Sequence, residues 1–131
     1  SRAKENLHMN ILVAENDKVT RDQAFVGLEN FGVFDIDVAK GMSALELARQ
    51  KDYAFALVGI NPSDKDGPDL VHDIRERNKS MEIIVMTGEI IANNMSKEKV
   101  HSNIFAFIKK PIDPLHFYQT VNRLRLRIMD R

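Results

Sequence analysis

The sequence predicts an α/β fold in which one parallel β-sheet carries helices on both faces. Five short apolar runs alternate with segments of helical periodicity, and each strand–helix repeat is roughly 20 residues long. Successive repeats of this kind are joined by right-handed crossovers, which place the strands parallel and the helices on both sides of the sheet. The 131 residues suffice for one such domain, and no internal repeat or low-complexity tract points to a second.

The first half of the chain contains two of these repeats. Residues 10–14 form a short apolar run, and Asp17 is placed to cap a helix predicted over residues 18–30. A glycine ends this helix, and residues 33–38 then alternate apolar side chains with two aspartates, as expected for an exposed strand. Apolar positions at helical spacing favour a second helix over residues 43–50.

The second half contains three more strands and their helices. Residues 53–60 are continuously apolar and predict a buried strand, and the turn formers of residues 61–68 predict a loop. Pro68 suits the first position of the next helix, which extends to about residue 77. The remaining elements are strands at residues 82–87 and 104–108 and helices at residues 90–100 and 113–131.

Differences in strand polarity predict the order of the sheet. The strand with Asp35 and Asp37 is the least apolar and is expected at an edge, whereas the other four are expected to be central or well covered. This favours a flavodoxin-like (βα)5 doubly wound sheet with strand order 2-1-3-4-5. In that order, a site forms beyond the carboxyl ends of strands 1 and 3.

Composition excludes several classes of function. Lys and Arg together number 19, as do Asp and Glu, so the net charge is zero and direct binding of nucleic acid or of an anionic membrane surface is not expected. The absence of cysteine excludes disulfides and thiolate chemistry. No apolar run approaches the ~20 residues of a membrane helix, and no signal peptide is visible, so a cytoplasmic location is expected. Residues 1–9 are interpreted as a polar leader, either a linker or a remnant of cloning, and residues 10–131 as the domain.

Four motifs stand where predicted strands 1, 3, 4 and 5 end. They are ILVAEND, ALVGINPSDKDG, IVMTGE and FIKKP, and they begin at residues 11, 56, 84 and 107. In this order and spacing the motifs resemble those of the receiver domains of bacterial two-component signalling, and the resemblance extends from residue 9 to the C-terminus. The last motif resembles the family's fifth strand with its Lys-cis-Pro.

The resemblance implies a role for each residue at these strand ends. In receiver domains two acidic residues after the first strand hold Mg²⁺, and an aspartate that ends the third strand takes a phosphoryl group from a histidine kinase. Glu15 matches the first acid, whereas Asn16 stands at the second acid and Gly59 at the acceptor. Asn61 matches a residue that offers its backbone carbonyl to the metal, and Lys110 matches the lysine that contacts the phosphoryl group. Thr87 matches the switch hydroxyl, and Phe107 matches the switch aromatic.

Gly59 limits the chemistry that the resemblance allows. Phosphoryl capture needs a carboxylate nucleophile, and residues 53–62 contain no aspartate or glutamate. With Asn16 and Gly59 neutral, Glu15 is the one carboxylate left of the family's three, so no metal, cofactor or catalytic residue is expected. Lys110 is expected to pair with Glu15 and close the pocket.

We therefore interpret the sequence as a pseudo-receiver, a non-enzymatic domain that lacks the acceptor aspartate and acts by contacting protein partners or a second copy. The resemblance implies that the contact face consists of the fourth helix, the fifth strand and the fifth helix. Its candidate residues are Ile91, Met95, Phe107, Phe117 and Arg123. For Phe107 itself, a core role is favoured over a switch role.

Two alternatives stay open at this point. One is a phosphorylatable receiver that uses a displaced acid such as Asp64. The other is a small-ligand binder in which Lys110 holds an anion in the emptied crevice at Gly59.

Overall fold

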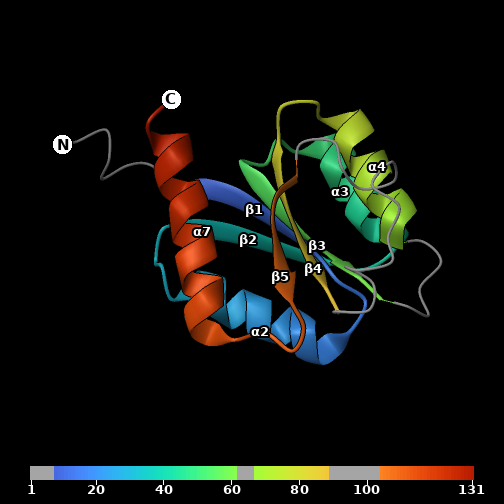
Figure 1. The fold of residues 1–131 in the computed structure, drawn as a ribbon. Coiled ribbons are helices and arrows are strands. Elements are labelled where there is room, and N and C mark those ends of the chain that lie inside the picture. The colour runs from blue at the N-terminus through green and yellow to red at the C-terminus, as the bar shows by residue number, and fades with distance from the viewer. Residues whose placement is uncertain (1–7, 62–66, 89–103) are drawn as a thin grey trace.

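The computed structural model describes residues 8–61, 67–88 and 104–131. In these residues five parallel strands form one sheet in the order β2-β1-β3-β4-β5 (Figure 1). The strands are β1 (Met9–Ala14), β2 (Phe34–Ala39), β3 (Phe55–Ile60), β4 (Glu82–Thr87) and β5 (Ile104–Lys109). The helices are α2 (Lys18–Glu29), α3 (Met42–Gln50), α4 (Gly67–Arg77) and α7 (Pro114–Met129). The predicted flavodoxin-like order is therefore confirmed.

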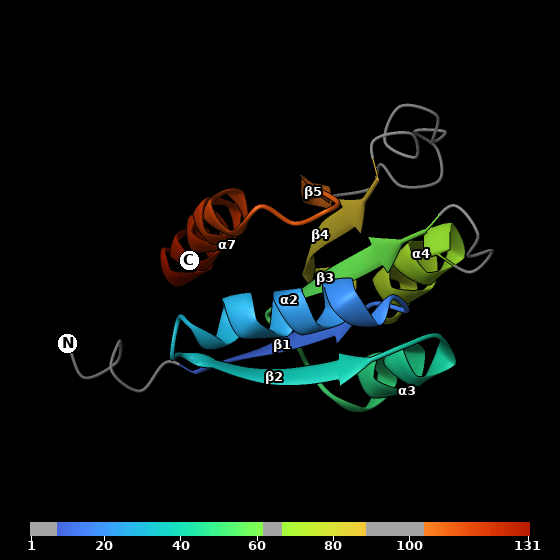
Figure 2. The same cartoon turned by 90° about the horizontal axis from the view of Figure 1, so that it is seen from below.

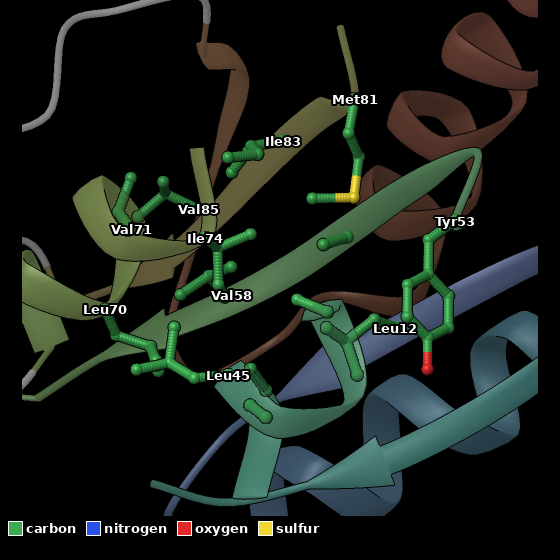
Figure 3. Packing of buried hydrophobic residues seen from close by; sticks show 14 of the residues in the cluster. Leu12, Leu45, Tyr53, Val58, Leu70, Val71, Ile74, Met81, Ile83 and Val85 are labelled. Atoms are coloured by element: carbon green, nitrogen blue, oxygen red, sulfur yellow. The ribbon is translucent and has the colours of Figure 1, made fainter. Parts of the chain in front are cut away.

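The described helices cover both faces of the sheet. Helices α2 and α7 lie on one face, and α3 and α4 lie on the other (Figure 2). On the α3–α4 side, Leu45 and Ile74 pack with Val58 and Val85 of the sheet (Figure 3). Burial of these apolar side chains on both faces stabilises the layered arrangement and aligns the carboxyl ends of the strands at one edge.

Local signals in the sequence set the helix starts. Asp17 caps α2 by accepting a hydrogen bond from the Thr20 backbone N–H at 2.9 Å. Asp113 caps α7 in the same way, and Pro114 occupies the first turn, where a missing N–H costs nothing. Among the described residues, none of the helices has the length and apolar character that a membrane crossing requires.

Some predicted boundaries differ from the observed ones. Met9, assigned to the leader, is the buried first residue of β1 and pairs with Phe34. Helix α4 already begins at Gly67, within the predicted loop. The predicted helix at residues 90–100, with its candidates Ile91 and Met95, lies outside the described residues, as does Asp64.

Strand β2 lies at an edge, as its aspartates predict. Its Asp37 carboxylate accepts hydrogen bonds from the Lys51 ammonium and the Tyr53 hydroxyl, both at 2.7 Å. These two donors, Lys51 above all, lower the pKa of Asp37. Burial and the neighbouring Asp37 in turn raise the pKa of the Tyr53 phenol. The cluster ties the edge strand to the start of β3.

Phe117 does not belong to a contact surface, which corrects the sequence-based prediction. Its side chain is 2% exposed and packs in the cluster between α2, α7 and the sheet. A Cβ atom on Gly27 of α2 would lie 2.5 Å from the Phe117 ring, so the two helices meet closely here. Phe117 faces inward because it shares the apolar side of α7 with Val121 and Leu124.

Phe107 is also placed differently from the prediction, because it is 44% exposed and not part of the core. Strand β5 is an edge strand, and its pairing with β4 shifts by one residue after Ile104. Beyond this irregularity Ile108 points into the α2–α7 cluster, and Phe107, the preceding residue, points to the opposite face of the sheet.

Candidate functional site

The polar residues predicted from the strand ends lie along the carboxyl edge of the sheet. Glu15 directly follows β1, Asn61 directly follows β3, and Lys110 directly follows β5. Parallel pairing brings these three positions together, although they are far apart in the sequence.

Glu15 and Lys110 form an ion pair that is almost completely removed from solvent. The Lys110 Nζ atom lies 2.9 Å from Glu15 Oε1 and donates a hydrogen bond to Oε2 at 3.1 Å. The Glu15 side chain is fully buried, and the Lys110 side chain is 13% exposed. The pair that the sequence predicts is therefore present.

Two further groups hold this ion pair in place. Glu15 Oε2 accepts hydrogen bonds from the Asp17 backbone N–H at 3.0 Å and from Asn61 Nδ2 at 3.2 Å. Lys110 Nζ donates to Asn61 Oδ1 at 2.7 Å. Asn61 thus bridges the acid and the base through its side-chain amide.

Gly59 provides the space in which the Glu15 carboxylate lies. A Cβ atom on Gly59 would be 1.7 Å from Glu15 Oε1 and 2.3 Å from its Cδ. No real pair of atoms can approach this closely without a bond, so a larger residue at position 59 and the observed conformation of Glu15 exclude each other. Glycine is needed here for space.

Asn16 and Thr87 lie nearby but have other partners. Asn16 Oδ1 accepts a hydrogen bond from the backbone N–H of Gly41 at 2.9 Å, which joins the end of β1 to the turn before α3. The buried Thr87 hydroxyl donates a long bond to the carbonyl of Gly88 at 3.4 Å. The Thr87 carbonyl accepts from the Lys110 backbone N–H at 2.8 Å, next to the cis peptide bond between Lys110 and Pro111.

The described residues at this edge offer few open oxygen ligands to a divalent cation. Mg²⁺ is usually anchored by one or two carboxylates that keep open coordination positions. Among the described residues that directly follow these strands, Glu15 supplies the carboxylate, and both of its oxygens already face the Lys110 ammonium. Among the described residues, no group of three or more acids and histidines could hold a metal ion. A cation would have to displace the ammonium to bind.

One charged cluster was not anticipated from the sequence. Glu82, the first residue of β4, is 8% exposed and pairs with Arg127 and Arg131 near the end of α7. The sequence did contain a signal for this cluster, because an acid stands at the start of an otherwise apolar strand. The partners of this acid are arginines near the C-terminal end of the chain.

Comparison with known proteins gives a consistent family match. The model of the response regulator receiver domain matches residues 11–122. Transcriptional regulatory protein CusR of Escherichia coli is 34% identical over 81 residues, which cover 61% of this chain and 35% of CusR. A cyclic di-GMP phosphodiesterase of Thermotoga maritima is 30% identical over 109 residues, which cover 80% of this chain and 28% of that protein. The matched part is thus 35% or less of the length of these relatives.

Solved structures share the fold at lower sequence identity. The receiver domain of AraT, a response regulator from Geobacillus stearothermophilus, superposes with a TM-score of 0.81 at 21% identity, covering 93% of this chain and 96% of that one. The signal receiver domain of an HD domain-containing protein from Pseudomonas fluorescens Pf-5 gives 0.80 at 18% identity, covering 95% and 99%.

Proposed function

This chain belongs to the response regulator receiver family of two-component signalling, and from that premise we propose that it is a pseudo-receiver. In this proposal the domain works without phosphorylation and without enzymatic activity, and its output is contact with other proteins. One observation carries the proposal: the Glu15 carboxylate fills the space that an acceptor side chain at position 59 would need.

None of the residues that the structure describes offers a substitute nucleophile at this position. Gly59 has no side chain, and Glu15 is buried and held by three hydrogen-bond donors. A carboxylate attacks phosphorus only when a lone pair can reach it, and the Lys110 ammonium and the Gly59 backbone enclose this one. Lys110, which the family uses to contact a phosphoryl group, is also engaged by Glu15 and Asn61.

The same features weigh against both alternatives. The Glu15 carboxylate takes up the space at Gly59 that a small anionic ligand would enter, and Lys110 already has an anion as its partner. A receiver that uses a displaced acid would still need a metal, and a metal at Glu15 would have to compete with the Lys110 ammonium for the carboxylate.

Treatment with a phosphoryl donor tests the proposal directly. The protein is incubated with Mg²⁺ and acetyl phosphate, and separately with beryllofluoride, beside a receiver that has its acceptor aspartate. We expect the intact mass of this protein to stay unchanged and its amide spectrum to lack shifts around Thr87, while the reference receiver responds to both reagents. A gain of one phosphate would overturn the proposal.

The proposed contact face includes strand β5 and the outward side of α7. Phe107 is 44% exposed on the edge strand, and Arg123 is an exposed residue of α7 whose guanidinium lies over the Phe105 ring. Exposed aromatic and arginine side chains are typical of protein interfaces. If the partner is a second copy, sedimentation velocity will show a dimer that Phe107→Ser weakens. Met42→Ser, which alters an exposed methionine of α3 outside this face, serves as the control.

A further inference from the structure

A polar pocket lies at the edge of the sheet opposite to Glu15 and Lys110. Strands β4 and β5 begin there, and helices α4 and α7 end there (Figure 1). The pocket has a volume of about 390 Å³. The residues that matter for its chemistry are Arg75, Lys79, Ser80, Glu82, Phe105 and Arg127.

Arg75 contributes a fixed positive charge to this pocket. The residue is 7% exposed, and its Nη1 atom donates to the carbonyls of Asn78 and Lys79, both at 3.2 Å, and to that of Met81. Burial lowers the pKa of Arg75 and nearby Glu82 opposes the change, but a guanidinium keeps its proton in proteins. The turn between α4 and β4 therefore folds around a permanent cation.

The acid that lines the pocket is already neutralised. Glu82 accepts contacts from Arg127 Nε at 3.4 Å and from the Arg131 guanidinium. Two cations face this one carboxylate, so Glu82 fixes the arginine side chains without cancelling their combined charge.

Phe105 also orients the arginines. The guanidinium of Arg123 lies 5.3 Å from its ring centroid, and that of Arg127 lies 5.6 Å from it. Arg127 is thus held by an aromatic ring and by Glu82 at the same time. Restraint of this kind lowers the conformational entropy that a side chain loses when it binds an anion.

Among the described residues, the charges that line this pocket or touch its lining are more often positive than negative. Five cations line it or touch its lining, namely Arg75, Lys79, Arg123, Arg127 and Arg131, against the two acids Glu82 and Glu76. The carboxyl ends of α4 and α7 add roughly half a negative charge each, which leaves about two positive charges in excess. The whole chain has a net charge of zero, so this excess is local.

We propose that this pocket binds a small polyanion of about nucleotide size that carries two or more phosphate or carboxylate groups. Its volume falls in the range of small-molecule sites, and guanidinium groups match the paired oxygens of phosphate and carboxylate. Lys79, whose side chain is exposed, adds a further positive charge at the rim. The proposal is independent of the pseudo-receiver function, because it uses the opposite edge of the sheet.

Titration of the isotopically labelled protein with inorganic pyrophosphate, and in parallel with citrate, tests the proposal. We expect saturable amide shifts at Ser80, Met81 and Phe105 with at least one of them. Lys79→Gln should weaken binding about fivefold. Lys18→Gln is the matched control, because Lys18 and Lys79 are both exposed helix-associated lysines paired with a nearby acid. Thermal melts check that both variants fold.

Three results would overturn the proposal. One is the absence of saturable shifts with both anions. Another is an equal loss of affinity in both lysine variants, which would indicate unspecific attraction. The third is a set of shifts centred on Glu15 and Lys110. Pyrophosphate binding preferred over citrate would identify phosphate as the recognised group, and the reverse preference would identify carboxylate.

Discussion

The Glu15 carboxylate lies in the volume that a side chain on Gly59 would occupy, with Oε1 only 1.7 Å from the position of a Cβ atom there. The glycine and the buried acid are therefore one structural feature. A receiver with an aspartate at position 59 could not keep Glu15 in this conformation. The observed geometry of the ion pair with Lys110 therefore depends on the absence of a side chain at position 59.

Gly59→Ala should destabilise the domain. The added methyl group forces the end of the Glu15 side chain to move, which disturbs its hydrogen bonds and its contact with Lys110. The clash is with the end of the Glu15 side chain, which can rotate away, and not with the backbone. The expected loss is therefore moderate, about 1–3 kcal/mol in the free energy of unfolding. Urea denaturation measures it.

A double-mutant cycle with Glu15→Ala separates this clash from other effects of the methyl group. If the two residues compete for one volume, Gly59→Ala should cost little once Glu15 is truncated, and the two effects should be far from additive. Additive losses would show that the methyl group acts elsewhere.

Glu15→Gln should destabilise the domain more than the loss of an exposed ion pair would. The variant keeps the size of the side chain but leaves the Lys110 ammonium, 13% exposed, without its counter-charge. We expect a loss of about 2–4 kcal/mol. Asp22→Asn removes the acid of the exposed pair with Lys18 and should cost less than about 1 kcal/mol. Equal losses in the two variants would contradict the structural importance of the buried pair.

The cluster of Asp37, Lys51 and Tyr53 at the edge strand β2 should make the stability of the domain depend on pH in the acidic range. The pKa of Asp37 is lowered, so its contribution is complete above the ordinary value of 3.8 and is lost as the pH falls through the lower folded-state pKa. Asp37→Asn should therefore reduce the stability at pH 7. It should also make the stability fall less steeply as the pH is lowered from about 5 to about 2. Tyr53→Phe removes the second donor and should make this fall less steep in part. Urea denaturation at several pH values measures both, and an unchanged slope in Asp37→Asn would contradict the assignment.

Phe117→Ala tests whether this residue belongs to the core. Its ring is 2% exposed and packs against Gly27, so truncation should cost about 3–5 kcal/mol. Leu115, two residues earlier on α7, is 63% exposed, and Leu115→Ala should change stability by about 0.5 kcal/mol or less. Thermal unfolding compares the two, and a small effect of Phe117→Ala would return the residue to the candidate contact surface.

The strand order could be predicted from the sequence because it depends on polarity differences between whole strands. The aspartates of β2 mark an edge, and the continuous apolar run of β3 marks the centre. Placement of a single aromatic residue depends on finer geometry. A one-residue shift in β5 sets the side to which Phe107 points, and the rotation of α7 turns Phe117 inward. Neither feature changes the apolar pattern that the sequence displays.

The candidate site was predictable to a similar extent. The pattern of strands places Glu15, Asn61 and Lys110 at strand ends along one edge of the sheet, and the resemblance to receiver domains matches Gly59 with the acceptor. That the Glu15 side chain fills the gap depends on a rotamer, which no sequence pattern specifies. The pairing of Glu82 with Arg127 is likewise a contact between positions far apart in the chain.

Gly59→Asp alone should not restore efficient phosphorylation. The new side chain needs the space that Glu15 occupies, so Glu15 must first leave its pair with Lys110. Asn16 would still deprive Mg²⁺ of its second carboxylate, since its amide is bonded to the turn at Gly41. We expect little phosphate incorporation from acetyl phosphate, as measured by intact mass.

Adding Asn16→Asp to Gly59→Asp should increase the incorporation, because two carboxylates can then anchor the metal beside the new nucleophile. Glu15→Asp as a third change shortens the side chain that blocks position 59 and should increase it further. Asn16→Asp without the change at position 59 is the control and should stay unlabelled, since it supplies a metal ligand but no acceptor. Strong labelling of the Gly59→Asp single variant would show that neither the conformation of Glu15 nor the missing second acid limits the chemistry.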